Sequence, residues 1–82
     1  MENKELEKDS SGVVVDGIEY LFKIGDRFSP PMDDEVVYEI IGYAGYTGMK
    51  NLLSYDVKVE FHDDIGYDSM LQITLKTCTK LN

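Results

Sequence analysis

The side chains with the clearest potential for chemistry form two acidic clusters, each in a stretch where a turn is expected. They are Asp33, Asp34 and Glu35 in the first cluster, and His62, Asp63 and Asp64 in the second. Carboxylate oxygens bind hard cations, and an imidazole nitrogen can join them. Calcium loops, however, place their ligands at alternating positions around a glycine, and neither cluster has that spacing. We therefore expect solvated carboxylates and no metal site.

The nucleophiles and bases of the chain are too few for a catalytic site. His62 is the only histidine and Cys78 the only cysteine. Acid–base catalysis near neutral pH relies chiefly on histidine, and a nucleophile needs a base within hydrogen-bond reach. No serine or cysteine motif pairs with His62, and the bases nearest in sequence to Cys78 are Lys76 and Lys80. The sequence predicts a protein that is not an enzyme and that needs no cofactor.

Tyrosines are the better functional candidates. Tyr43 and Tyr46 border a glycine-rich connection, and Tyr67 is expected in the loop before the last strand. Tyrosine gives a large contact area at low entropic cost and is enriched at protein interfaces. Gathered beside the aspartates, these rings would form an aromatic and acidic surface suited to a basic or proline-rich peptide. The residues that we predict to bind a partner are Tyr43, Tyr46, Tyr67, Asp33, Asp34, Asp63 and Asp64.

The alternative for the tyrosines is a structural role. The chain has no tryptophan, so tyrosine must supply bulk to the core. Tyr20, Tyr38 and Tyr55 are expected to fill that core with their hydroxyl groups at its rim. On this view half or more of the six tyrosines are structural.

The charge of the chain restricts its partners. Sixteen acidic residues against eight basic ones give a formal net charge of −8. This charge repels phosphate backbones and anionic membrane surfaces, so we expect neither direct nucleic-acid binding nor membrane binding. An acidic surface keeps a small protein soluble, and it can also meet a basic protein partner. A single cysteine excludes an internal disulfide, which favours the cytoplasm.

The elements that position these residues are predicted to be mainly β-strands. Residues 1–12 are polar and acidic around a single leucine, and are expected to form a flexible tail before one small domain, residues 13–82. Asp16-Gly17 between two apolar runs predicts a hairpin with a type I′ turn. Residues 36–43 are rich in branched residues and tyrosine, which predicts a central strand.

The rest of the chain continues this pattern. Residues 55–62 alternate between apolar and polar side chains, and residues 63–66 read as a turn with Gly66 in the left-handed position. Residues 70–77 are predicted to form the last strand, and residues 78–82 to fray or turn. The connection of residues 44–54 is open: residues 49–53 could form one helical turn or extend the next strand. About five short strands must curl to cover a core, as a small barrel or a strongly bent antiparallel sheet.

The succession of these segments resembles small SH3-like β-barrels of bacteria and mobile elements. It consists of the entry turn Ile24-Gly25-Asp26-Arg27-Phe28 followed by strands at residues 37–41, 57–61 and 71–76. The resemblance covers roughly residues 22–76 and implies a five-stranded barrel. Such barrels commonly act as adaptors for peptides, proteins or nucleic acid, so it implies binding without naming the ligand.

Two functions follow as hypotheses. The first is a non-catalytic interaction module that binds a protein or peptide through its tyrosine-bearing loops. The alternative is an acidic phage or mobile-element inhibitor whose carboxylates imitate nucleic acid and block a basic host enzyme. Lys58 interrupts the acidic row of Asp56 and Glu60, which counts against mimicry on that strand. Unpaired strand edges also favour pairing between copies, and residues 13–15 could form a homodimer in this way.

Overall fold

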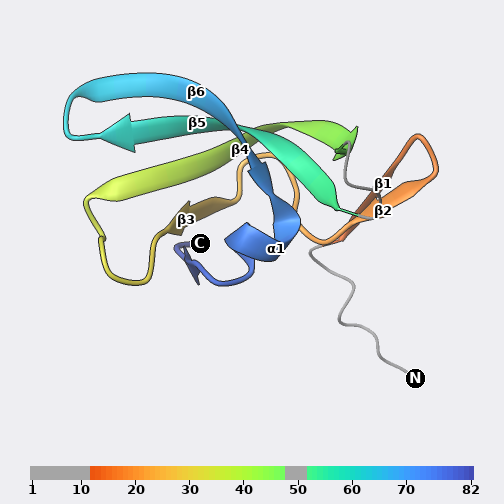
Figure 1. Ribbon diagram of the computed structural model, residues 1–82, viewed down its shortest axis with the longest axis horizontal. Coiled ribbons are helices and arrows are strands. Elements are labelled where there is room, and N and C mark those ends of the chain that lie inside the picture. Colours follow the sequence, from red (N-terminus) through yellow and green to blue (C-terminus); the bar gives the residue numbers. More distant parts are fainter. Residues whose placement is uncertain (1–11, 48–51) are drawn as a thin grey trace.

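The computed structural model describes residues 12–47 and 52–82, and its elements are almost all strands (Figure 1). In chain order these are β1 (Val13–Val15), β2 (Ile18–Tyr20), β3 (Arg27–Ser29), β4 (Val36–Tyr46), β5 (Leu53–Phe61), β6 (Asp64–Leu71), α1 (Gln72–Leu75) and β7 (Thr79–Lys80). The expected flexible tail lies outside the described residues except for Gly12, as does most of the segment 49–53. The division into a tail and one domain stays a prediction.

The predicted N-terminal hairpin is confirmed. β1 and β2 pair in antiparallel fashion, with Val13 opposite Tyr20 and Val15 opposite Ile18. Asp16 and Gly17 have φ angles of 53° and 78°. A type I′ turn requires positive φ at both central residues, and Asp-Gly accepts this at low cost. The hairpin forms a separate two-stranded sheet at one end of the molecule (Figure 1).

The other five strands form one antiparallel sheet in the order β6-β5-β4-β3-β7. β4 is central, as predicted, and two bulges interrupt its pairing with β5, between Ile40 and Gly42 and between Tyr43 and Gly45. Bulges bend a strand and increase its twist, and β4, β5 and β6 curve visibly (Figure 1). Among the described residues β6 and β7 are the two edges and do not pair with each other. The bent antiparallel sheet is therefore confirmed, and the closed barrel is not formed.

The turn before β3 is held by a buried carboxylate. Gly25 has a φ of 100°, which favours glycine, and its N–H donates to the Ile40 carbonyl over 2.9 Å. The Asp26 side chain is buried and its Oδ2 accepts a hydrogen bond from the Lys23 N–H at 3.1 Å. The Gly25-Asp26 pair of the sequence motif thus has a structural role that fixes the path of the chain into the sheet.

Three predictions about the C-terminal half are wrong. The turn after β5 consists of His62 and Asp63, so Gly66 lies inside β6 without a positive φ. The predicted strand at residues 70–77 ends at Leu71, and α1 follows it. The last residues do not fray: β7 pairs with β3, with Phe28 opposite Lys80. The Leu81 N–H also donates to the Arg27 carbonyl over 2.8 Å.

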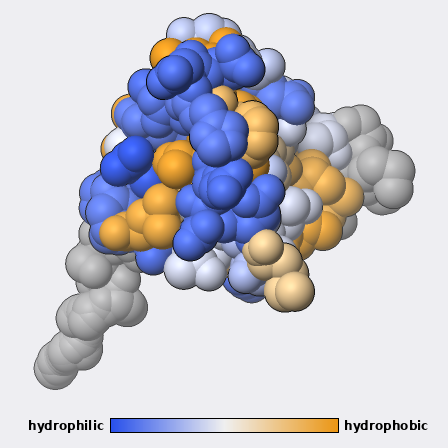
Figure 2. All heavy atoms as spheres, turned by 90° about the vertical axis from the view of Figure 1, so that its left-hand side faces the viewer, coloured by the Kyte–Doolittle hydropathy of each residue, from blue (hydrophilic) through white to orange (hydrophobic). Residues whose placement is uncertain are grey.

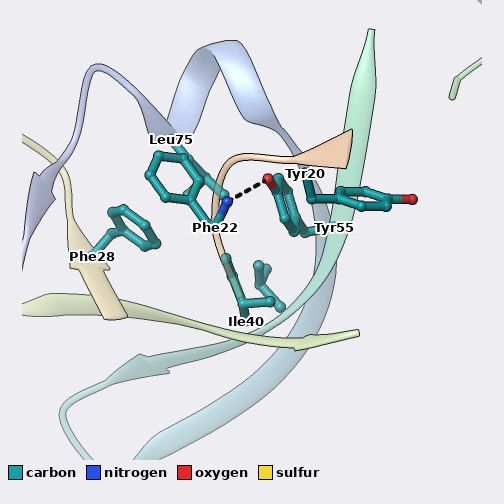
Figure 3. Close-up of a cluster of buried hydrophobic side chains, with 7 residues drawn as sticks. Tyr20, Phe22, Phe28, Ile40, Tyr55 and Leu75 are labelled. Atoms are coloured by element: carbon teal, nitrogen blue, oxygen red, sulfur yellow. Dashed lines mark hydrogen bonds between the residues drawn. The ribbon is translucent and has the colours of Figure 1, made fainter. Parts of the chain in front are cut away.

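The core is small and aromatic. Its buried apolar residues come from β2 and the segment after it, from β3, β4 and β5 of the large sheet, and from α1; they are Tyr20, Phe22, Phe28, Ile40, Tyr55, Val57 and Leu75. Figure 3 shows the rings of Phe22 and Phe28 beside Leu75, and the Tyr55 hydroxyl pointing at the Phe22 amide. Tyr20 and Tyr55, assigned to the core from the sequence, are almost fully buried there.

Candidate functional site

Four of the predicted partner-binding residues lie at one end of the sheet. Asp33 and Asp34 precede β4, Asp63 lies in the β5–β6 turn, and Asp64 begins β6. Val36 pairs with Phe61, and Phe61 with Asp64, so both loops meet at the left-hand end in Figure 1. His62 Nε2 lies 3.1 Å from Glu35 Oε1 and bridges the two loops when the imidazole is protonated. We call Asp33, Asp34, Asp63 and Asp64 the acidic end.

Two of the predicted tyrosines lie at the opposite end. Tyr43 is seven residues beyond Val36 in β4, which corresponds to roughly 23 Å at the rise of a strand. Its hydroxyl accepts a hydrogen bond from the Ile24 N–H at 3.0 Å, and its ring lies 4.7 Å from that of Tyr20. Tyr46 is more exposed, at 56%. The structure therefore does not bring Tyr43 and Tyr46 to the acidic end, and Tyr43 packs against the core.

The third tyrosine, Tyr67, lies inside β6 and not in a loop. It pairs with Lys58 of β5 and is 72% exposed, and Ile65 on the same face is 57% exposed. Opposite residues in antiparallel strands share a face of the sheet. We call the face that bears Tyr67 and Ile65 the outer face. Lys58 pairs with Glu39, and Glu39 with Arg27, so this row of residues lies on the outer face as well.

Ion pairs between side chains neutralise much of the charge on the outer face. Glu39 Oε1 lies 3.6 Å from Lys58 Nζ and 4.0 Å from Arg27 Nε, and Arg27 Nη2 lies 3.9 Å from Glu60 Oε1. By contrast, Asp63 and Asp64 form no ion pair with another described residue. Acidic side chains without an ion pair to another described residue therefore lie at the acidic end and along β6, and Asp16, Glu19 and Asp56 are further examples elsewhere on the surface.

The inner face of the sheet carries a second group of residues beside β6. Tyr38 pairs with Val59, and Val59 with Gly66, so these three form a row across the face that also bears buried Phe28. A Cβ atom at Gly66 would meet no atom within 4 Å, which leaves open space above this part of the strand. We call Tyr38, Val59 and Gly66 the inner row.

Carboxylates surround the inner row. Burial raises the pKa of the Tyr38 hydroxyl, and the nearby Cys78, Asp33 and Asp68 raise it further. A negative charge near a phenol disfavours the phenolate, so Asp33 and Asp68 act on the Tyr38 pKa in the same direction as burial. The inner row is therefore half-buried at Tyr38 and Val59 and exposed at Gly66, and Asp64 and Asp68 lie on either side of Gly66 on the same face of β6.

β6 itself is an exposed strand edge. Residues 64–69 are all exposed, and within 12–47 and 52–82 only β5 pairs with β6. The sequence from Asp63 to Leu75 contains no lysine or arginine. Figure 2 shows the acidic end from outside: its surface is mostly hydrophilic, and hydrophobic side chains form separate patches.

The described residues contain no cluster of metal-ligating side chains, and the thiol of Cys78 is partly buried. Within residues 12–47 and 52–82, no three His, Cys, Asp or Glu side chains are placed to hold a metal ion. Burial raises the pKa of the Cys78 thiol, whose Sγ lies 3.5 Å from the Thr74 carbonyl oxygen. A raised pKa keeps a cysteine in the unreactive thiol form. The surface can bind through backbone, charge and aromatic contacts.

Sequence reasoning misses three residues of this region. It assigns Tyr38 to the core alone and Gly66 to a turn, and it does not single out Asp68. The register of β5 and β6 brings them together, and that register follows from a turn at His62, which lacks glycine. The spacing of Asp64, Gly66 and Asp68, all on one face of a strand, is the signal that could have found them.

Comparisons with protein-family models, with curated proteins and with solved structures find no match to this chain. Within the described part of the chain, no helix is both long and apolar enough to cross a membrane.

Proposed function

We propose that this protein is a non-catalytic interaction module that binds a protein partner on the β5–β6 side of its sheet. The observation that supports this most directly is Tyr67, a large aromatic residue that is 72% exposed on an acidic edge strand. An exposed aromatic ring beside uncompensated carboxylates is typical of a surface that meets a basic partner. The acidic end and Tyr67 belong to this surface. Tyr43 and Tyr46 lie at the opposite end of the sheet and are not part of it.

We further propose that the fold is related to that of small SH3-like barrels. The last strand, β7, returns beside the first strand of the large sheet, β3, and a helical turn precedes it. The first and the last strand of the large sheet in sequence order, β3 and β7, therefore lie side by side, as expected for a small barrel that is incompletely closed. A cytoplasmic location is part of the same proposal, because the single cysteine excludes an internal disulfide.

A matched pair of exposed tyrosines tests the proposal. Tagged wild-type protein, Tyr67→Ser and Tyr46→Ser are used for affinity capture from lysate of the source cell, with the bound proteins quantified. We expect a partner that is lost with Tyr67→Ser and retained with Tyr46→Ser. Equal retention by all three proteins would place the contact elsewhere and contradict the proposed surface.

The acidic inhibitor remains the second candidate, because the four aspartates of the acidic end lie together. The pairing of Glu39 and Glu60 with bases counts against mimicry on the outer face. Exchanging all four aspartates for asparagine distinguishes the two functions. Inhibition of a nucleic-acid enzyme that this exchange abolishes, and that added salt weakens, would favour mimicry over the interaction module.

A further inference from the structure

We propose that β6 is a docking edge for an extended, basic segment of a partner protein, which adds to the sheet as a sixth strand beside β6. This inference rests on the proposed function and names its binding mode and partner class. It depends on three features of β6: a backbone edge that no described strand covers, aspartates without an ion pair to a described residue, and open space at Gly66.

The backbone edge supplies the main contact. β6 has eight residues, and its neighbour on one side is β5. No other described strand covers its second side. In a strand, about half of the backbone N–H and C=O groups point away from any one neighbour, so an extended peptide can hydrogen-bond to them. The exception is the Ser69 N–H, which donates to Asp68 Oδ1 at 2.8 Å. The other edge, β7, has only two residues and offers far less.

Charge determines which strand can pair with this edge. Asp64 and Asp68 lie on the inner face of β6, and no lysine or arginine occurs from Asp63 to Leu75. Natural proteins often place charges on an edge strand to prevent pairing with copies of themselves. Aspartates prevent pairing with another acidic chain in this way, and they attract a basic one.

Pairing between two copies of β6 brings like charges together. A two-fold axis through Gly66 would place Asp64 opposite Asp68 of the second copy, and an axis through Asp68 would place Asp68 opposite itself. An axis through Tyr67 places Asp68 opposite Gly66, so the two Asp68 side chains are diagonal neighbours at roughly 7–8 Å. Like charges across a strand pair are destabilising, and each chain carries a net charge of −8. A basic segment therefore fits this edge better than a second copy.

The open space at Gly66 fits a long basic side chain. A residue opposite Gly66 on an added strand is diagonal to both Asp64 and Asp68, at roughly 7–8 Å, a span that arginine or lysine can cover. Its aliphatic stem would lie over the inner row, where Val59 and Tyr38 are half-buried. On the outer face, Ile65 and Tyr67 would contact apolar side chains of the same segment. The expected ligand thus alternates basic and apolar residues.

A synthetic peptide tests this directly. The probe is an eight-residue peptide of alternating arginine and valine, titrated into the full chain with backbone amide shifts followed by NMR. We expect shifts in residues 64–71 and loss of binding when alternate peptide nitrogens are methylated, because methylation removes the N–H donors. A block peptide of four arginines followed by four valines is the charge-matched control. Equal binding of the block and alternating peptides would show charge attraction alone and overturn the inference.

Paired variants test the two aspartates. Asp64→Asn with Asp68→Asn should weaken binding of the alternating peptide by about tenfold or more, since two charge-assisted contacts are lost. Asp16→Asn with Glu19→Gln removes the same charge from the β1–β2 hairpin and should have little effect. Thermal unfolding of both variants checks that they are folded. Equal weakening by the two pairs would contradict a site on β6.

The outcome can be separated from that of the proposed function. If partner capture depends on Tyr67 but the peptide does not shift β6, the interaction module stands and the strand-addition inference fails. If capture is independent of Tyr67 and the peptide does not bind, both fail. A dimer in sedimentation that Asp68→Lys dissociates would assign the edge to a second copy and overturn the inference.

Discussion

The Tyr55 hydroxyl and the Gln72 side chain join the core of the sheet to helix α1. Tyr55 Oη donates to Gln72 Oε1, which also accepts the Leu21 N–H at 2.9 Å. Tyr55 Oη in turn accepts the Phe22 N–H at 3.1 Å (Figure 3). One phenol and one amide thus connect β5, α1 and the segment after β2, which are far apart in the sequence.

Removal of the Tyr55 hydroxyl should therefore destabilise the protein. Tyr55→Phe keeps the ring but leaves the Phe22 N–H without its acceptor and takes one donor from Gln72. We expect the free energy of unfolding to fall by about 1–3 kcal/mol, the cost of an unsatisfied buried polar group. Urea denaturation measures this loss. The control is Tyr46→Phe, at a hydroxyl with no hydrogen bond to another described residue, which should change stability by less than about 0.5 kcal/mol.

Stability should also fall at alkaline pH. Burial raises the pKa of Tyr55 above its ordinary value of 10.0, and burial likewise raises that of Tyr38. The neutral phenols are therefore favoured in the folded state, and their contribution is complete below about pH 10. As the pH rises further, the unfolded chain loses these protons first and the free energy of unfolding decreases. The combined Tyr38→Phe and Tyr55→Phe variant should show a shallower decrease above about pH 10 in pH-dependent denaturation; an unchanged slope would assign the loss to other groups.

The local signals in the sequence predicted the N-terminal half of the fold well. Asp16-Gly17 specifies its turn through backbone conformation alone, and the branched residues of β4 favour a strand in any context. The C-terminal half depends on contacts between distant residues. Leu71, Ile73 and Leu75 alternate as in a strand, yet Leu75 is buried and Ile73 is 53% exposed because residues 72–75 turn into α1. Four residues are too few for helical periodicity to be seen.

The candidate site was predicted in part for the same reason. The acidic end could be found because its aspartates lie in or directly beside loops that the prolines and polar runs indicate. The grouping of Tyr38, Gly66 and Asp68 depends on the β5–β6 register, which changes face with every shift of one residue. The predicted turn at residues 63–66 gives a different register from the turn at His62, and for this reason Gly66 was not placed opposite Val59 in the inner row.

The entry turn to β3 should be sensitive to the Asp26 carboxylate. Asp26→Ala removes the acceptor of the Lys23 N–H, and we expect a loss of about 1–3 kcal/mol in the free energy of unfolding. Lys80 Nζ lies 3.7 Å from Asp26 Oδ1, but its side chain is 37% exposed. Lys80→Met should therefore cost less than about 1 kcal/mol, as for other partly exposed ion pairs. Urea denaturation of the two variants compares them; equal losses would show that the ion pair and not the backbone contact holds the turn.

Gly66 provides a variant that separates stability from binding. Glycine weakens a strand, and Gly66 has no positive φ and open space where a Cβ atom would lie. Gly66→Thr should therefore raise the free energy of unfolding by about 0.5–1 kcal/mol. Gly25→Ala, at a φ of 100°, should lower it by about 1 kcal/mol or more, which makes it the control for glycine replacement.

The same variant should bind the alternating peptide less well. The threonine side chain of Gly66→Thr would occupy the space above the inner row, where the stem of a basic residue is expected to lie. Peptide binding should therefore weaken although the protein is more stable, which a loss of folding cannot explain. NMR titration of the variant with the arginine–valine peptide measures this. Undiminished binding by a stabilised Gly66→Thr would show that the space at Gly66 is not used.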